Sequence, residues 1–142
     1  MSITVEREAA AEDAAALSEG IVAFNKAHVP DLEDVADEVR FFVLAKDDAG
    51  ALQGGIRAVC YWSTLHIELV WLDETARGSG IGAKLMSEAE DYAQAHNCEK
   101  ALVETTSWQA KPFYEKLGYT LMATLPGRPK GHASHYLSKS LV

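Results

Sequence analysis

The spacing of apolar residues changes several times along the 142-residue chain between a helical and an alternating pattern. Residues 3–7 alternate and predict a short first strand. Residues 9–27 are rich in Ala, Leu and Glu, with Leu17, Ile21 and Phe24 at helical spacing, and predict the first helix. Pro30 ends this pattern, because it lacks the N–H that would continue a helix.

The rest of the chain alternates between strand-like and helix-like segments. Residues 65–72 have the β-branched and aromatic content of a strand that is buried on both faces. Gly118 is predicted to end the last helix as a left-handed cap. The elements predicted after Pro30 are a short helix over 32–39, strands over 40–46, 54–62 and 65–72, a helix over 81–96, a strand over 100–105, a helix over 108–117, and strands over 119–125 and 134–141.

This succession predicts an α/β fold with a mixed sheet, formed by a single domain over residues 1–142. The order β-α-α-β-β-β-α-β-α-β-β indicates a central, mostly antiparallel twisted sheet with some parallel pairing, flanked by helices. A chain of this length can bury one ordinary core. No internal repeat or Pro/Gly/Ser-rich linker divides it.

Charge and composition argue against some classes of binding partner. The net charge of −8 is a poor match for nucleic acid, which requires a basic stripe. Residues 1–40 hold ten acidic residues against three basic ones, which indicates either solvated helix faces or a field that attracts a cationic amine. No apolar run reaches about 18 residues, and the N-terminus lacks a signal-peptide pattern, so we expect no membrane partner and a cytoplasmic location.

The two cysteines have neither metal-ligand spacing nor a disulfide framework. Cys60 lies in a strand-like run and Cys98 follows a helical one, so packing as reduced, buried thiols is the expected role of both. We therefore predict no metal site.

A glycine-rich segment between a predicted strand and a predicted helix is the first candidate for chemistry. It reads Arg77-Gly78-Ser79-Gly80-Ile81-Gly82. Backbone N–H groups and the helix dipole make such a helix start an anion site, and an arginine adds a planar donor suited to phosphate. The segment also satisfies a loose dinucleotide fingerprint, although no acidic residue follows at the required place, and a tight turn without a ligand stays an alternative.

Two motifs in register resemble those of the GNAT acetyltransferases. The first runs from Leu72 through the glycine-rich segment and resembles the family's [QR]-x-x-G-x-[GA] loop after a strand. The second is Ala110-Lys111-Pro112-Phe113-Tyr114-Glu115-Lys116-Leu117-Gly118-Tyr119, which resembles A-x-x-F-Y-E-K-L-G-[FY]. The resemblance covers residues 65–142 and extends to the whole chain in element order. It implies the GNAT fold and an N-acetyltransferase that uses acetyl-CoA as the acetyl donor.

The resemblance also implies which residues hold the donor. The loop residues Arg77, Gly78, Ser79, Gly80, Ile81 and Gly82 match the positions that bind the CoA pyrophosphate. The strand end Val70, Trp71 and Leu72 matches the backbone that pairs with pantetheine, and the Val70 N–H matches the donor to the acetyl carbonyl. Ser107 stands where the family often has an asparagine that contacts pantetheine, so that contact is expected to change.

Tyr114 matches the family's general acid, which protonates the departing thiolate. Acyl transfer also needs the acceptor amine neutral, and an alkylamine has a pKa of about 10. Glu68 is the first candidate for the base, directly or through water, and His66 is the second, since alternation places both on the face of Val70. The alternative is that both are polar residues bonded only to neighbouring loops.

The acceptor is expected to be a primary amine of a small molecule or peptide. Candidate acceptor contacts are Asn25, His28 and Asp31 near the first helix and Arg128 and His132 in the late loop, with Trp108 and Gln109 shaping the pocket. Two other functions stay open, a non-catalytic acyl-CoA-binding module or sensor and a nucleotide-binding regulator. A homodimer is common in the family, although no residue pattern specifies an interface.

Overall fold

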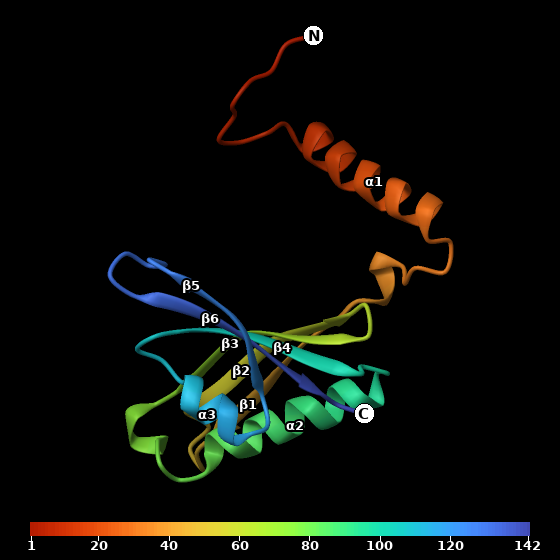
Figure 1. Cartoon of the computed structure of the whole chain (residues 1–142). Coiled ribbons are helices and arrows are strands. Elements are labelled where there is room, and N and C mark those ends of the chain that lie inside the picture. Colours follow the sequence, from red (N-terminus) through yellow and green to blue (C-terminus); the bar gives the residue numbers. More distant parts are fainter. The chain divides into compact units, whose positions relative to one another are not determined.

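The computed structural model describes residues 1–142, which divide into two compact units, Met1–Asp34 and Val35–Val142. The N-terminal unit contains the helix α1, Ala11–His28, where the first helix was predicted (Figure 1). Acidic residues in its first turn and Lys26 in its last complement the helix dipole. Lys26 also donates from Nζ to the Leu32 carbonyl at 2.7 Å and thereby fixes the chain that follows the helix.

Two predicted elements at this end of the chain are wrong, so the predicted element order is not matched. Residues 3–7 are irregular, because an extended segment becomes a strand only when a neighbour pairs with it and the sheet pairs no strand with them. Instead of a helix over 32–39 there is one 3₁₀ turn, η1, Val35–Asp37. The chain is already extended at Val39, which leaves no room for a full α-helix.

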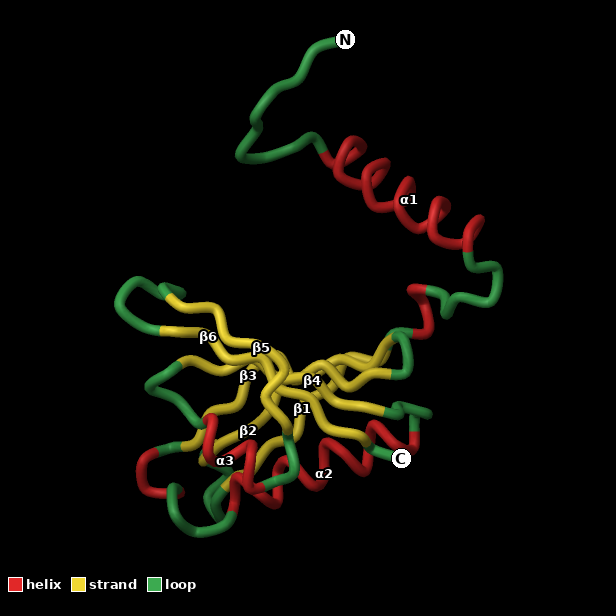
Figure 2. Tube along the Cα trace, in the orientation of Figure 1, coloured by secondary structure: helices red, strands yellow, loops and turns green.

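The second unit is built on a six-stranded mixed sheet (Figure 2). Its strand order is β1-β2-β3-β4-β6-β5, and every neighbouring pair is antiparallel except β3 and β4. The predicted mostly antiparallel sheet with some parallel pairing is confirmed. The strands are β1 Val39–Lys46, β2 Leu52–Tyr61, β3 Thr64–Leu72, β4 Lys100–Thr106, β5 Thr120–Pro126 and β6 Ala133–Ser140.

One long helix covers one face of the sheet and closes the core. The helix α2, Ile81–Ala95, presents Leu85, Met86 and Ala89 to the buried faces of β2 and β3. Ala89 and Ala93 are fully buried, and their small side chains let the helix backbone approach the strands closely. Cys60 and Cys98 are both buried in this core, as predicted.

The helix that follows β4 is shorter than predicted. It is α3, Lys111–Lys116, preceded by a turn in which the Gln109 N–H donates to the Thr106 carbonyl at 3.0 Å. Pro112 lies in the first helical turn, where its missing N–H costs nothing. Gly118 follows with φ of 96°, the left-handed conformation predicted for it. No helix combines the length and the apolar composition that a membrane span requires.

The strands β3 and β4 separate partway along their length, and this separation creates the space for a site. Their parallel ladder covers only Thr64–Ile67 of β3 and ends at the Ile67–Val103 pair, although both strands continue. Opposite β2, Glu68 is an extra residue between Ile67, which pairs with Ala58, and Leu69, which pairs with Arg57. Such a bulge bends a strand and interrupts its alternation.

The bulge also limits the burial that was predicted for β3. Thr64, Leu65 and Ile67 before the bulge are buried, whereas Glu68, Leu69 and Trp71 after it are exposed. The prediction of burial on both faces is therefore wrong for the second half of the strand. That half has one edge open, since no strand pairs with it on the β4 side.

Candidate functional site

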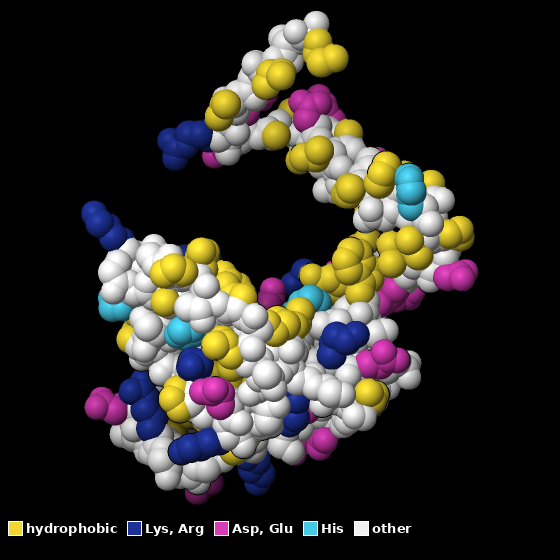
Figure 3. All heavy atoms as spheres, viewed as in Figure 1, with side chains coloured by type: hydrophobic (Ala, Val, Ile, Leu, Met, Phe, Trp, Pro, Cys, Tyr) yellow, Lys and Arg dark blue, Asp and Glu magenta, His cyan; other side chains and the backbone are white.

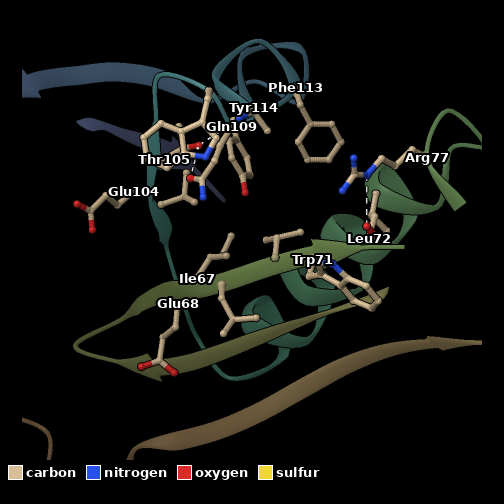
Figure 4. A pocket seen from close by; sticks show the side chains of 15 residues that line it. Ile67, Glu68, Trp71, Leu72, Arg77, Glu104, Thr105, Gln109, Phe113 and Tyr114 are labelled. Atoms are coloured by element: carbon tan, nitrogen blue, oxygen red, sulfur yellow. Dashed lines mark hydrogen bonds between the residues drawn. The ribbon is translucent and has the colours of Figure 1, made fainter. Parts of the chain in front are cut away.

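A pocket of about 670 Å³ lies between the separated ends of β3 and β4, with α3 beside it. This volume suits a small organic ligand. Figure 4 shows side chains from β3 on one side and from β4 and α3 on the other. The lining residues are Ile67, Glu68, Leu69, Val70, Trp71, Leu72, Arg77, Val103, Glu104, Thr105, Trp108, Gln109, Ala110, Phe113 and Tyr114.

The open edge of β3 gives the pocket a wall that can bind amides. Backbone N–H and C=O groups beyond Ile67 have no β4 partner, because the ladder ends there. An extended ligand with amide groups can add itself to such an edge as a strand does. Val70, Trp71 and Leu72, which were predicted to contact the donor, all lie on this wall.

Tyr114 is a buried phenol in the opposite wall. Its side chain is 5 % exposed, and its ring packs edge-on against Phe113 and Tyr119, with centroids 5.2 and 5.9 Å away. Figure 4 shows its hydroxyl directed toward β3. Burial raises the pKa of Tyr114 to about 12, because the apolar surroundings disfavour the phenolate. The phenol is therefore protonated at neutral pH and can give a proton or a hydrogen bond to a ligand.

The glycine-rich segment forms the start of α2 beside the pocket. Gly78 and Gly80 have φ of 76° and 84°, a left-handed conformation that other residues rarely adopt. Gly80 caps the helix without a side-chain hydrogen bond, and no acidic residue lies in the first turn. The N–H groups of that turn are therefore available to an external anion.

Arg77 is the residue of the glycine-rich segment that lines the pocket, and Gly82 packs behind the lining residues Leu72 and Phe113. A Cβ at Gly82 would lie 3.1 Å from Leu72 Cδ1 and 3.2 Å from the Phe113 ring, so glycine permits the close packing of α2 against β3 and α3. Arg77 donates from Nε to the Leu72 carbonyl at 3.3 Å, which directs its guanidinium along the pocket and leaves the terminal nitrogens for a ligand. These features fit a phosphate-bearing group.

Glu68 lies at the other end of the pocket and is held by two arginines. Arg57 Nε is 3.3 Å from Glu68 Oε1, and Arg40 Nη1 is 3.7 Å from Glu68 Oε2. Figure 4 shows the carboxylate directed away from Tyr114. A water would be needed to carry a proton between this carboxylate and a group beside the phenol.

His66 does not line the pocket. Its ring stacks on Tyr61 at 4.0 Å between centroids, and its Nε2 is buried without a hydrogen-bond partner. Burial lowers the pKa of His66 below its usual value, and the carboxylates of Glu68 and Glu38 offset this in part. The bulge at Glu68 explains the separation, because it breaks the alternation that was expected to place His66 and Val70 on one face.

Ser107 and His132 contact each other instead of lining the pocket. Ser107 Oγ and His132 Nδ1 are 3.2 Å apart, and the Ala133 N–H donates to the same hydroxyl at 3.3 Å. The His132 ring also packs edge-on against Trp108 at 4.8 Å. Asn25, His28 and Asp31 belong to the N-terminal unit, so their acceptor contacts stay predictions.

Three features of the pocket lining were missed from the sequence. Glu104 pairs with Arg128, whose guanidinium also donates to Ser134 Oγ at 3.0 Å. Thr105 Oγ1 accepts from the Ala110 N–H and donates to Gln109 Oε1, both at 3.2 Å. Phe113 lies between Tyr114 and Gly82. Only Phe113 had a signal, since it precedes the tyrosine in the second motif.

The surface has no continuous basic region on the face shown in Figure 3, where Lys and Arg side chains lie among Asp and Glu side chains. The net charge of the chain is −8.

Comparisons with known proteins agree with this geometry. Residues 9–119 match the model of the acetyltransferase (GNAT) family. A blasticidin-S acetyltransferase from Streptomyces morookaense is 41 % identical over 95 residues, which cover 66 % of this chain and 70 % of that protein. An acetyltransferase from Agrobacterium fabrum is 27 % identical over 98 % of both chains. The crystal structure of an acetyltransferase from Bacillus cereus has a TM-score of 0.85 and 26 % identity, covering 96 % of this chain and 97 % of that one.

Proposed function

The chain belongs to the GNAT family and is an acetyl-CoA-dependent N-acetyltransferase, and we propose that it transfers the acetyl group directly to an amine in the pocket between β3 and β4. The observation that carries this proposal is that Arg77 and Tyr114 line the same pocket. An anion site alone would fit a sensor, whereas acyl transfer needs a proton donor beside the same ligand. Acetyl-CoA supplies the thioester that the acceptor amine attacks.

Different parts of the pocket would bind different parts of acetyl-CoA. Arg77 and the N–H groups at the start of α2, from Ile81 and Gly82, would bind the pyrophosphate. The open edge of β3 would bind the pantetheine arm, and the Val70 N–H would donate to the acetyl carbonyl as negative charge grows on its oxygen. Tyr114 would give its proton to the departing sulfur.

Glu68 would remove the amine proton through a water. We expect Glu68→Gln to lower kcat/KM about tenfold at neutral pH and to matter less as pH approaches the pKa of the amine, about 10, because the amine then needs no base. Initial rates of thiol release from pH 6.5 to 9.5 measure this.

Glu104→Gln is the matched control, since it removes another carboxylate from the lining of the same pocket. It should leave the pH profile unchanged. If Glu68→Gln lowers kcat/KM by the same factor at every pH, or if kcat/KM depends on pH in the same way in Glu68→Gln and Glu104→Gln, Glu68 is not the base.

The proposed acceptor is a small polar molecule that carries an amine. The blasticidin-S acetyltransferase supports this choice, since its name states a small-molecule acceptor. The negative net charge would attract a cationic amine, and Trp71 and Trp108 offer flat apolar surfaces in the pocket. A thiol-release screen with nucleoside antibiotics, aminoglycosides, polyamines and peptides tests it, and activity confined to peptides would overturn it.

The domain organisation and setting complete the proposal. Residues 1–142 would act as one acetyltransferase domain in the cytoplasm, where acetyl-CoA is available, and the family match across 9–119 supports the single domain.

Two copies of the chain would associate through the edge strand β1, since its Phe42 and Leu44 side chains are 65 % and 51 % exposed. Light scattering at micromolar concentration should give the mass of a dimer, and a monomer would exclude it.

A further inference from the structure

The side-chain amide of Gln109 has a fixed orientation in the pocket wall. Its Oε1 accepts from the Thr106 N–H at 3.0 Å and from Thr105 Oγ1 at 3.2 Å. A backbone N–H can only donate, so the atom that faces it must be the amide oxygen. The orientation of the amide therefore follows from chemistry, and Nε2 is the atom left free.

Nε2 carries two N–H donors that no group of the protein accepts. Gln109 lines the pocket, and Figure 4 shows its side chain on the same wall as Tyr114. Thr105 and Thr106 belong to β4, so the amide is anchored to the strand that forms this side of the pocket. A donor held in this way in a ligand-sized pocket selects a ligand group with a hydrogen-bond acceptor.

Ser107 does not line the pocket. Its hydroxyl accepts from the Ala133 N–H at 3.3 Å and lies 3.2 Å from His132 Nδ1. The residue at the position where the resemblance implies a pantetheine contact therefore lies outside the pocket lining, whereas Gln109, two residues later, belongs to it.

We propose that Gln109 binds the acyl donor, by donating from Nε2 to a carbonyl oxygen of its pantetheine arm. The inference rests on the proposed function, because it needs acetyl-CoA in this pocket. The arm has two amide carbonyls and a thioester carbonyl, which are acceptors that a donor-only group can bind. The β3 edge would hold the arm from one side and Gln109 from the other, so Gln109 acts on the donor and not on the acceptor amine.

Gln109→Glu isolates the proposed contact. The carboxylate still accepts from Thr106 and Thr105, so the melting temperature should change little, but the two N–H donors are lost and a negative oxygen faces the carbonyl. Calorimetry with CoA should show a Kd raised about tenfold or more. Gln109→Met, which is neutral and also lacks the donors, should raise it about three- to tenfold.

A truncated acyl donor distinguishes the effect of this contact from an effect on phosphate binding. Acetyl-pantetheine keeps the carbonyls and lacks the pyrophosphate, so its KM should rise by the same factor in Gln109→Glu as the KM of acetyl-CoA. If the wild-type protein binds CoA and both variants bind it with the same Kd as the wild-type protein, the inference is wrong and the proposed function stands. If the wild-type protein binds no CoA, the proposed function itself fails.

Discussion

Replacing Tyr114 with phenylalanine is expected to lower kcat by about 10²- to 10⁴-fold, the range that a general acid typically contributes. The affinity for acetyl-CoA should stay within about twofold, because the ring and its packing against Phe113 and Tyr119 remain. Calorimetry gives the affinity, and single-turnover thiol release gives the rate of the chemical step.

The raised pKa of Tyr114 determines how this effect depends on pH. With a pKa of about 12, the phenol stays protonated up to at least pH 10, so the wild-type rate should show no Tyr114-linked loss in that range. The same burial that disfavours the phenolate also disfavours a free thiolate in the pocket, and this keeps proton transfer to sulfur favourable. The Tyr114→Phe deficit should therefore be nearly constant from pH 7 to pH 9.5.

Tyr119→Phe is the matched control, because it removes the same hydroxyl from a neighbouring buried tyrosine. The Tyr119 hydroxyl donates to Glu90 Oε2 at 2.8 Å, and Tyr119 does not line the pocket. Its loss should lower the free energy of unfolding by about 1–3 kcal/mol and leave kcat near the wild-type value. Equal rates for Tyr114→Phe and the wild-type protein on an accepted substrate would exclude the acid role.

Replacing Arg77 with alanine is expected to raise the Kd for acetyl-CoA by about 10- to 100-fold, with little change in kcat. Charge-assisted hydrogen bonds to a phosphate are worth about 1.5–3 kcal/mol each. The Nε bond to the Leu72 carbonyl fixes the guanidinium, so the terminal nitrogens lose little freedom on binding. Arg77→Lys should recover part of the affinity, since it restores the charge without the planar donor.

Acetyl-pantetheine controls for damage to the fold in the Arg77 variants. Because it has no pyrophosphate, its KM should be the same for the wild-type protein and for Arg77→Ala. A parallel loss with both donors would assign Arg77 a structural role at the end of β3, and the pyrophosphate would then bind elsewhere.

The sequence predicted the structure most accurately where a short motif determines its own backbone conformation. The segment 77–82 joins a strand to a helix and needs glycine at Gly78 and Gly80, and both have positive φ. Tyr114 could be found because it stands inside a long motif with Gly118 as its helix cap. Both motifs concern local structure, which neighbouring residues determine.

Contacts between distant segments could not be predicted in the same way. Periodicity does not encode register, so the end of the β3–β4 ladder at Ile67 and Val103 had no signal, and neither did the bulge at Glu68. The arginines that hold Glu68 come from two other strands, and Ser107 meets His132 only because the late loop returns to it. The strand expected at residues 3–7 failed for a related reason, since it depended on a partner.

We propose that acetyl-CoA lies along the open edge of β3, between the start of α2 and Tyr114. Amide hydrogen exchange with and without CoA tests this placement, because it reports on the backbone N–H groups that would bind. We expect slower exchange on CoA binding in residues 68–72 and 77–83, with β1 and β5 unchanged. If CoA binds and exchange in both segments stays the same, this placement of the donor is wrong.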